Sequence, residues 1–154
     1  MVSSPAPCAD RAPPESIPRA HLTDLPHLEQ LARDLAASRA GQAAATQQLL
    51  TSLTRLHALV RSHSTFENEV VFPSLLREGT HVCLRHITVA REEHETLRDV
   101  LVEMNEIASA LEPSSRMSHS SDLLTAGIRD LERDLLEHLH LENNVLYGRI
   151  AANE

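Results

Sequence analysis

Apolar residues recur along most of the chain at alternating steps of three and four, the spacing that places side chains on one face of an α-helix. No segment alternates apolar and polar residues as a half-buried strand does, and no Asn-Gly or Asp-Gly pair marks a β-hairpin. Turn-forming residues interrupt the pattern at Gly41, at Glu78-Gly79-Thr80 and at Pro113-Ser114-Ser115. We therefore predict four helical stretches, at residues 21–38, 43–77, 82–111 and 120–149.

The connections between these stretches are short, so consecutive helices are expected to pack antiparallel. The predicted fold class is all-α, an up-down antiparallel four-helix bundle formed by residues 21–150. Residues 1–20 hold five of the eight prolines and few apolar residues. We expect them to form a disordered Pro-rich tail.

Each helical stretch carries one stripe of residues expected to face the core. The stripes are His21, Leu25, Leu28, Ala32 and Leu35; Thr46, Leu49, Leu53, Leu56, Val60, His63, Glu67 and Val70; Ile87, Ala90, His94, Leu97, Leu101, Met104, Ala108 and Leu111; and Leu124, Ile128, Leu131, Leu135, His138, Glu142 and Val145. They are apolar except where they carry His or Glu, and Glu is among the residues least often buried without a partner.

Composition argues against several classes of function. The formal net charge is −8 and no cluster of arginines stands out, so nucleic acid is not an expected partner. No apolar run approaches the roughly 20 residues that span a bilayer, and the first residues lack the apolar core of a signal peptide. Two cysteines are too few for a disulfide framework. We expect a cytoplasmic protein that does not bind a membrane.

The polar positions of the stripes predict a metal site. His63 and Glu67 form one His-x-x-x-Glu pair, and His138 and Glu142 form a second. This spacing places both side chains of a pair on the same helix face, one turn apart. His94 faces the same interior from the third helix. Burying such groups in an apolar seam costs several kcal/mol unless something compensates, and a divalent cation held between them would do so.

Two other interpretations compete with this one. A buried His–Glu hydrogen-bond network without a metal would explain one such pair better than it explains two pairs and a fifth polar group. The ferritin-like pattern needs inward-facing Glu-x-x-His on two helices. Here Glu78 and His81 are separated by a glycine break, while Glu137 and His140 lie off the predicted seam. The remaining histidines are interpreted as surface or boundary residues: His27, His57, His81, His86, His119 and His140.

Three segments resemble the hemerythrin-like HHE domain: HLHLENNVLYGRI at 138–150, HSTFENEVVFP at 63–73 and REEHE at 91–95. The likeness covers residues 21–150 and is strongest to the di-iron proteins that repair iron–sulfur clusters damaged by nitric oxide or oxidants. It implies a di-iron centre with His63, His94 and His138 as terminal ligands. Glu67 and Glu142 would bridge the two irons.

One position separates the branches of that family. Oxygen-carrying hemerythrins place a second histidine one turn after the third-helix histidine, and this chain has Arg98 there. The resemblance therefore favours the repair branch.

The chain departs from the family pattern in three places. The first-helix histidine of the family falls on Pro18, which cannot coordinate a metal, and His21, one turn later, is the candidate replacement. Many repair proteins carry an N-terminal cysteine-containing domain, where this sequence has a short tail with Cys8. Tyr147-Gly148 replaces the terminal Phe-Pro pair and is expected to alter only the helix end.

The expected function is that of a non-haem iron protein of the nitrosative and oxidative stress response. Its small ligand would be O2 or NO, and its protein partners would be damaged iron–sulfur proteins. The alternative is a module that senses or binds O2, NO or a metal without turnover. A third interpretation, a helical interaction protein whose metal site has decayed, is motivated by Pro18. Ligand types alone do not separate iron from manganese or zinc.

Overall fold

The computed structural model describes residues 19–38, 43–77, 80–111 and 119–148. The main helices are α1 (Arg19–Ser38), α2 (Ala43–Phe66), α4 (Thr80–Ala110) and α5 (His119–Leu141). A π-helical turn, η1 (Glu67–Val71), leads from α2 into the short α3 (Phe72–Arg77), and a second one, η2 (Glu142–Leu146), comes after α5. The predicted helical stretches begin and end within two residues of these segments. The expected tail lies outside the described residues.

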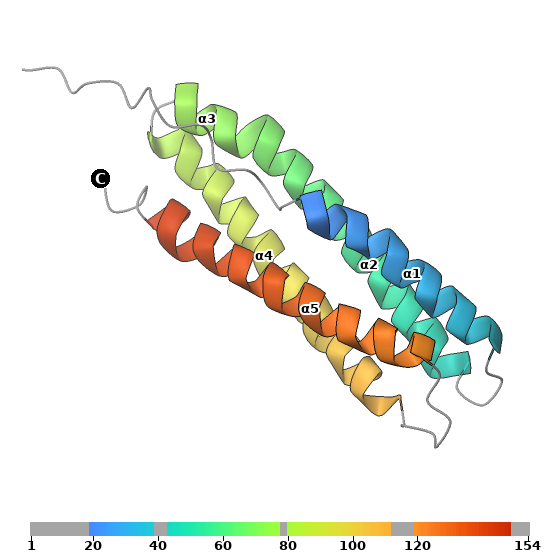
Figure 1. Ribbon diagram of the computed structural model, residues 1–154. Coiled ribbons are helices and arrows are strands. Elements are labelled where there is room, and N and C mark those ends of the chain that lie inside the picture. Colours follow the sequence, from blue (N-terminus) through green and yellow to red (C-terminus); the bar gives the residue numbers. More distant parts are fainter. Residues whose placement is uncertain (1–18, 39–42, 78–79, 112–118, 149–154) are drawn as a thin grey trace, which may run out of the picture.

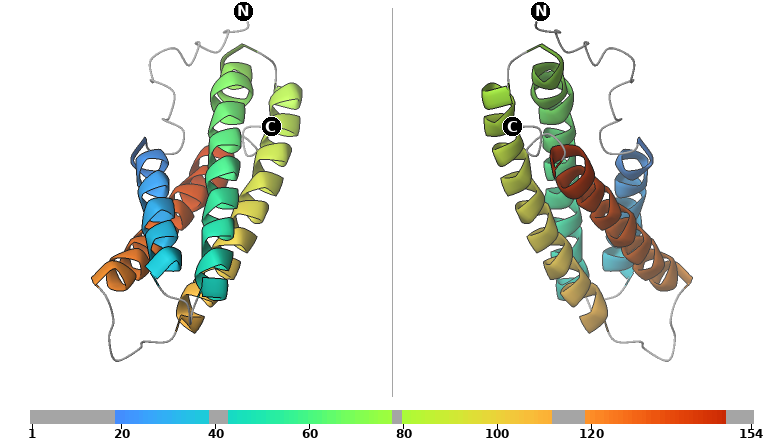
Figure 2. Two further views of the ribbon diagram at one scale, coloured as in Figure 1. Left: turned by 90° about the vertical axis from the view of Figure 1, so that its right-hand side faces the viewer. Right: turned by 90° about the vertical axis from the view of Figure 1, so that its left-hand side faces the viewer.

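The four long helices lie side by side and alternate in direction (Figure 1). α1 packs on α2, α2 on α4, α4 on α5, and α5 returns to α1, so the helices surround a common core. α5 is inclined to the others, which is clearest from the side (Figure 2). The predicted all-α up-down bundle is therefore confirmed. Within the described part of the chain, no helix is long and apolar enough to cross a membrane.

Two hydrophobic clusters fill the core. The larger one runs through the half of the bundle where α1 ends and α2 begins, and the predicted stripes supply most of it, including Leu28, Leu53, Leu101 and Ile128. The smaller cluster lies at the opposite end and consists of Val71, Phe72, Ile87, Ala90 and Tyr147. The polar residues of the stripes lie between the two clusters, because they occupy the turns that separate them along α2, α4 and α5.

The two π-helical turns correct the predicted stripes. A π-turn inserts one extra residue and rotates the next part of the helix around its axis. Val70 was expected in the core, but Val71 is the fully buried residue at the end of η1. Val145 was expected in the core and is 41% exposed, whereas Tyr147 is fully buried beyond η2. A strict helical period could not anticipate either shift.

Helices α1 and α5 approach closely at Gly127. A methyl group at this position would lie 2.6 Å from Leu28 Cδ2, too close for an ordinary contact. We predict that Gly127→Ala destabilises the metal-free protein by about 1 kcal/mol in urea unfolding, because overpacking outweighs the gain in helix propensity.

Gly148→Ala is the matched control for that substitution. A methyl group there would meet nothing closer than Asn143 O at 3.7 Å, so this variant should be neutral or slightly stabilising. Equal effects of the two substitutions would show that Leu28 moves aside freely and that this close approach places no restraint on the packing.

Candidate metal centre

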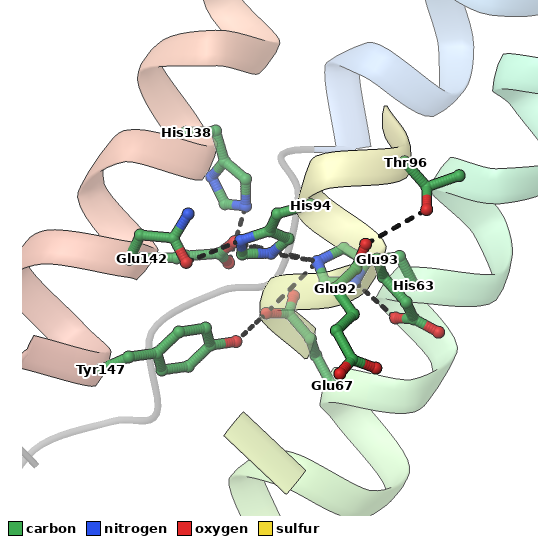
Figure 3. A network of polar contacts seen from close by, with 10 residues as sticks. His63, Glu67, Glu92, Glu93, His94, Thr96, His138, Glu142 and Tyr147 are labelled. Carbon is green, nitrogen blue, oxygen red and sulfur yellow. Dashed lines mark hydrogen bonds and ion pairs between the residues drawn. The ribbon is translucent and has the colours of Figure 1, made fainter. Parts of the chain in front are cut away.

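Three helices bring the polar residues together between the two hydrophobic clusters (Figure 3). His63 comes from the last full turn of α2, and Glu67 is the first residue of η1. His94 lies near the middle of α4. His138 lies in the last turn of α5, and Glu142 is the first residue of η2. Each predicted His-x-x-x-Glu pair therefore straddles the start of a π-helical turn, a feature often found at functional sites.

Four of these side chains form one buried cluster. Donor atoms of His63, Glu67, His94 and Glu142 all lie within 4.8 Å of one another. His63 Nε2 lies 2.9 Å from His94 Nε2 and 3.5 Å from Glu67 Oε1. His94 Nε2 lies 3.3 Å from Glu142 Oε2.

His138 is placed at the edge of this cluster. Its Nε2 lies 2.8 Å from Glu142 Oε1, whereas His94 faces the other oxygen of that carboxylate, Oε2. The His138 side chain is 13% exposed. The structure thus brings together five of the six residues selected from the sequence. The sixth, His21, lies in α1 but its side chain is outside the described part, as is Pro18.

Of the histidines interpreted as surface or boundary residues, none with a described side chain belongs to the cluster. His27, His119 and His140 are exposed, and His81 has no described side chain. His57 bonds Glu29 across the α1–α2 interface at 2.9 Å. His86 lies 3.1 Å from Ser74 Oγ, which donates its own proton to the carbonyl of Val71, so this pair does not form an activated serine.

Two residues that the sequence analysis did not select orient the imidazoles. Glu93 Oε2 lies 2.9 Å from His63 Nδ1, and Asn143 Oδ1 lies 3.0 Å from His94 Nδ1. An oxygen acceptor at Nδ1 holds the proton on that nitrogen and leaves a lone pair on Nε2. Both Nε2 atoms then point at the same small volume, 2.9 Å apart, where a shared proton or a metal cation satisfies them.

The electrostatic surroundings of the cluster also favour bound positive charge. Burial raises the pKa of the Glu67 carboxyl to about 7, with the Glu142 charge adding to the effect and His63 partly opposing it. Burial alone would lower the pKa of His63, but the nearby Glu142 and Glu67 carboxylates outweigh this and raise it. Burial would raise the pKa of Glu142, but the surrounding histidines hold it well below its usual range. In the absence of a metal, bound protons supply the positive charge.

The donor set fits a metal ion. Glu67 Oε2 and Glu142 Oε2 are buried, and neither accepts a hydrogen bond from the described residues. Buried carboxylate oxygens are normally satisfied, so these two are available to a cation. Imidazole and carboxylate ligands together suit iron and its neighbours in the first transition series.

The family comparison agrees with this geometry. Residues 15–150 match the family described as "Hemerythrin HHE cation binding domain", which is most of the chain. The chain belongs to this family. The resemblance seen in the sequence is therefore confirmed, and the iron cofactor that it implied agrees with the donor cluster.

Several curated relatives of this HHE domain share one name. The "Iron-sulfur cluster repair protein YtfE" of Enterobacter sp. (strain 638) is 29% identical over 134 residues, which cover 87% of this chain and 61% of that protein. Proteins of the same name from Escherichia coli O1:K1 / APEC and Escherichia fergusonii are 28% identical over the same shares. The chain spans about three fifths of the length of these relatives.

Tyr147 overturns one sequence-based expectation. The Tyr147-Gly148 pair was expected to alter only the end of the last helix of the HHE domain. Instead the Tyr147 side chain is fully buried, and its hydroxyl donates a hydrogen bond to Glu67 Oε1 (Figure 3). The reason is the π-turn η2, which rotates Tyr147 inward.

We predict that metal binding and folding respond oppositely to pH. Between about pH 5 and 7 the folded, metal-free HHE domain holds a proton on Glu67 that the unfolded chain has released, because the pKa of this carboxyl is raised to about 7. Above the ordinary histidine pKa of 6.5 it also retains a proton on His63, so its stability falls as pH rises. A metal must displace these protons, so its affinity rises over the same interval, by up to about tenfold per pH unit for each proton displaced. The melting-temperature gain from anaerobic Fe²⁺ should therefore be larger at pH 8 than at pH 6.

Glu67→Gln is the control for this prediction. It removes the carboxyl whose pKa is raised, so the metal-free variant should lose less stability than the parent chain between pH 5 and 7. A melting-temperature gain from Fe²⁺ that does not change with pH would contradict the assignment of these protons to the metal cluster.

Glu93 should contribute to metal affinity although it does not belong to the four-residue cluster. Glu93→Gln keeps the shape of the side chain but removes the charge opposite His63 Nδ1, and we expect roughly tenfold to a hundredfold weaker Fe²⁺ binding by anaerobic titration. Glu92→Gln removes an exposed carboxylate from the preceding position and should leave affinity within about twofold. Equal losses in both variants would mean that only the net charge of this region matters.

Proposed function

We propose that this HHE domain is a non-haem di-iron protein that acts on nitrosative or oxidative damage and helps to repair iron–sulfur clusters. In this proposal His63, His94 and His138 are terminal ligands and Glu67 and Glu142 bridge the metals. His21 is the candidate sixth ligand. O2 or NO is the small ligand, and damaged iron–sulfur proteins in the cytoplasm are the partners.

The observation that carries the proposal is the buried cluster of His63, Glu67, His94 and Glu142, all within 4.8 Å of one another. A structural hydrogen-bond network would pair each donor with an acceptor. Here the Nε2 atoms of two buried imidazoles lie 2.9 Å apart, and two buried carboxylate oxygens beside them accept no hydrogen bond from the described residues. Such a group is stable when a cation fills it.

The surrounding chain suits redox chemistry with a small ligand. The two hydrophobic clusters lie on either side of the site and limit the access of water to it. A cavity of about 70 Å³ between α2 and α4 is lined by Leu59, Ser62, Glu93, Thr96 and Leu97, and is large enough for a diatomic molecule or a water. Iron bound at the site would supply the electron transfer, and the chain would hold the ligands in place.

The named relatives support the repair interpretation. They are iron–sulfur cluster repair proteins by name, and this chain aligns with about three fifths of their length. A module that binds O2, NO or a metal without turnover is the second candidate, because the donor cluster alone is sufficient for binding. Both candidates need the same metal centre, so the metal is tested first.

We expect close to two irons per chain after purification from iron-replete cells, with a near-ultraviolet absorption band from the paired ferric ions. His63→Ala should lower the iron content to one or less and remove the band, because its Nε2 faces the other donors. His140→Ala changes an exposed histidine of α5 and should keep both irons. Metal-free wild-type protein under these conditions would favour the helical interaction protein with a decayed site.

A repair assay separates the remaining candidates. An iron–sulfur enzyme inactivated by nitric oxide is incubated anaerobically with the iron-loaded chain, and its activity is measured over time. Recovery with the wild-type chain but not with His63→Ala would support repair. Reversible binding of NO or O2 without recovery would support the binding module instead.

A further inference from the structure

The two metal-ligating segments of this chain are internal counterparts. Each has a His, a Glu four residues later, an Asn directly after the Glu, and an aromatic residue five positions after the Glu. The segments run from His63 to Phe72 and from His138 to Tyr147. In both, the backbone N–H of the aromatic residue bonds the carbonyl of its own Glu and closes the π-turn. Phe72 and Tyr147 therefore occupy equivalent positions.

The two aromatic residues differ by one hydroxyl group. Phe72 and Tyr147 are both buried in the smaller hydrophobic cluster, so a ring without a polar atom packs well at this kind of position. The Tyr147 hydroxyl donates a hydrogen bond to Glu67 Oε1, which belongs to the opposite segment. Glu67 Oε2 accepts no hydrogen bond from the described residues.

Tyr147 thereby contacts three of the proposed ligands. Its backbone N–H bonds the carbonyl of Glu142, and its hydroxyl bonds the carboxylate of Glu67. Its ring stacks on His94, with the ring centroids 6.0 Å apart and the planes inclined by 19°. Figure 3 shows the hydroxyl directed at Glu67 from the end of the last helix. The Glu142 carboxylate, in contrast, is surrounded by histidines.

We propose that Tyr147 is a positioning residue of the metal centre, which fixes the Glu67 carboxylate through Oε1 and makes the two bridging glutamates chemically different. This inference rests on the proposed function. A donated hydrogen bond draws electron density from a ligand carboxylate and restricts its rotation. The Tyr147 hydroxyl should therefore favour the ferrous state of the centre and improve the fit of Glu67 to the metal.

Tyr147→Phe tests the inference, because it gives the second segment the same aromatic residue that the first segment has at Phe72. We expect about tenfold weaker Fe²⁺ binding in anaerobic titration, and a lower midpoint potential for the iron-loaded protein. In a Glu67→Ala background, which has no acceptor for the Tyr147 hydroxyl, the same substitution should change the residual affinity by less than about twofold, because its effect passes through that carboxylate.

Ser64→Ala is the matched control. Ser64 comes directly after His63, and its buried hydroxyl has no hydrogen-bond partner among the described residues, so its removal should change neither affinity nor potential. Unchanged affinity and potential in Tyr147→Phe would overturn the inference, as would an undiminished effect in the Glu67→Ala background. Both results leave the proposed function intact if the wild-type chain holds two irons. Failure of the wild-type chain to bind iron would instead reject the proposed function.

Discussion

The arrangement of this end of the bundle depends on one electrostatic constraint: two carboxylates and three imidazoles share a nearly dry space. Isolated charges of this kind cost several kcal/mol each to bury. Without a metal, the site holds protons instead, since the pKa of Glu67 rises to about 7 and that of His63 rises as well. A metal ion would replace these protons and satisfy the same donors. Metal affinity, stability and pH are therefore linked through one cluster.

The remainder of the bundle keeps that cluster rigid. The larger hydrophobic cluster packs on one side of it and the smaller one on the other, so a ligand helix cannot shift without opening apolar contacts. Glu93 and Asn143 fix the imidazole rings from outside the cluster. The two π-turns contribute as well, because each begins at a glutamate and rotates an aromatic residue into the core.

The chain is not symmetric about its metal site, although its two ligand segments are built alike. His63 and His94 face each other, whereas His138 faces Oε1 of Glu142. Tyr147 adds a hydroxyl group to one glutamate and leaves the other to the histidines. Two metal ions bound there would have different surroundings, and a difference of this kind tunes reduction potential in metal sites.

The sequence by itself determined the helical stretches, the fold class and the residues that meet at the site, because helical periodicity places His63, Glu67, His94, His138 and Glu142 on inward faces. It did not determine the course of the helix after each glutamate. The π-turns depend on tertiary packing, so Val145 was placed in the core and the Tyr147-Gly148 pair was expected to alter only the helix end, and both predictions were wrong. The partners Glu93 and Asn143 were also missed, since hydrogen bonds between helices depend on how the helices pack and not on spacing within one of them.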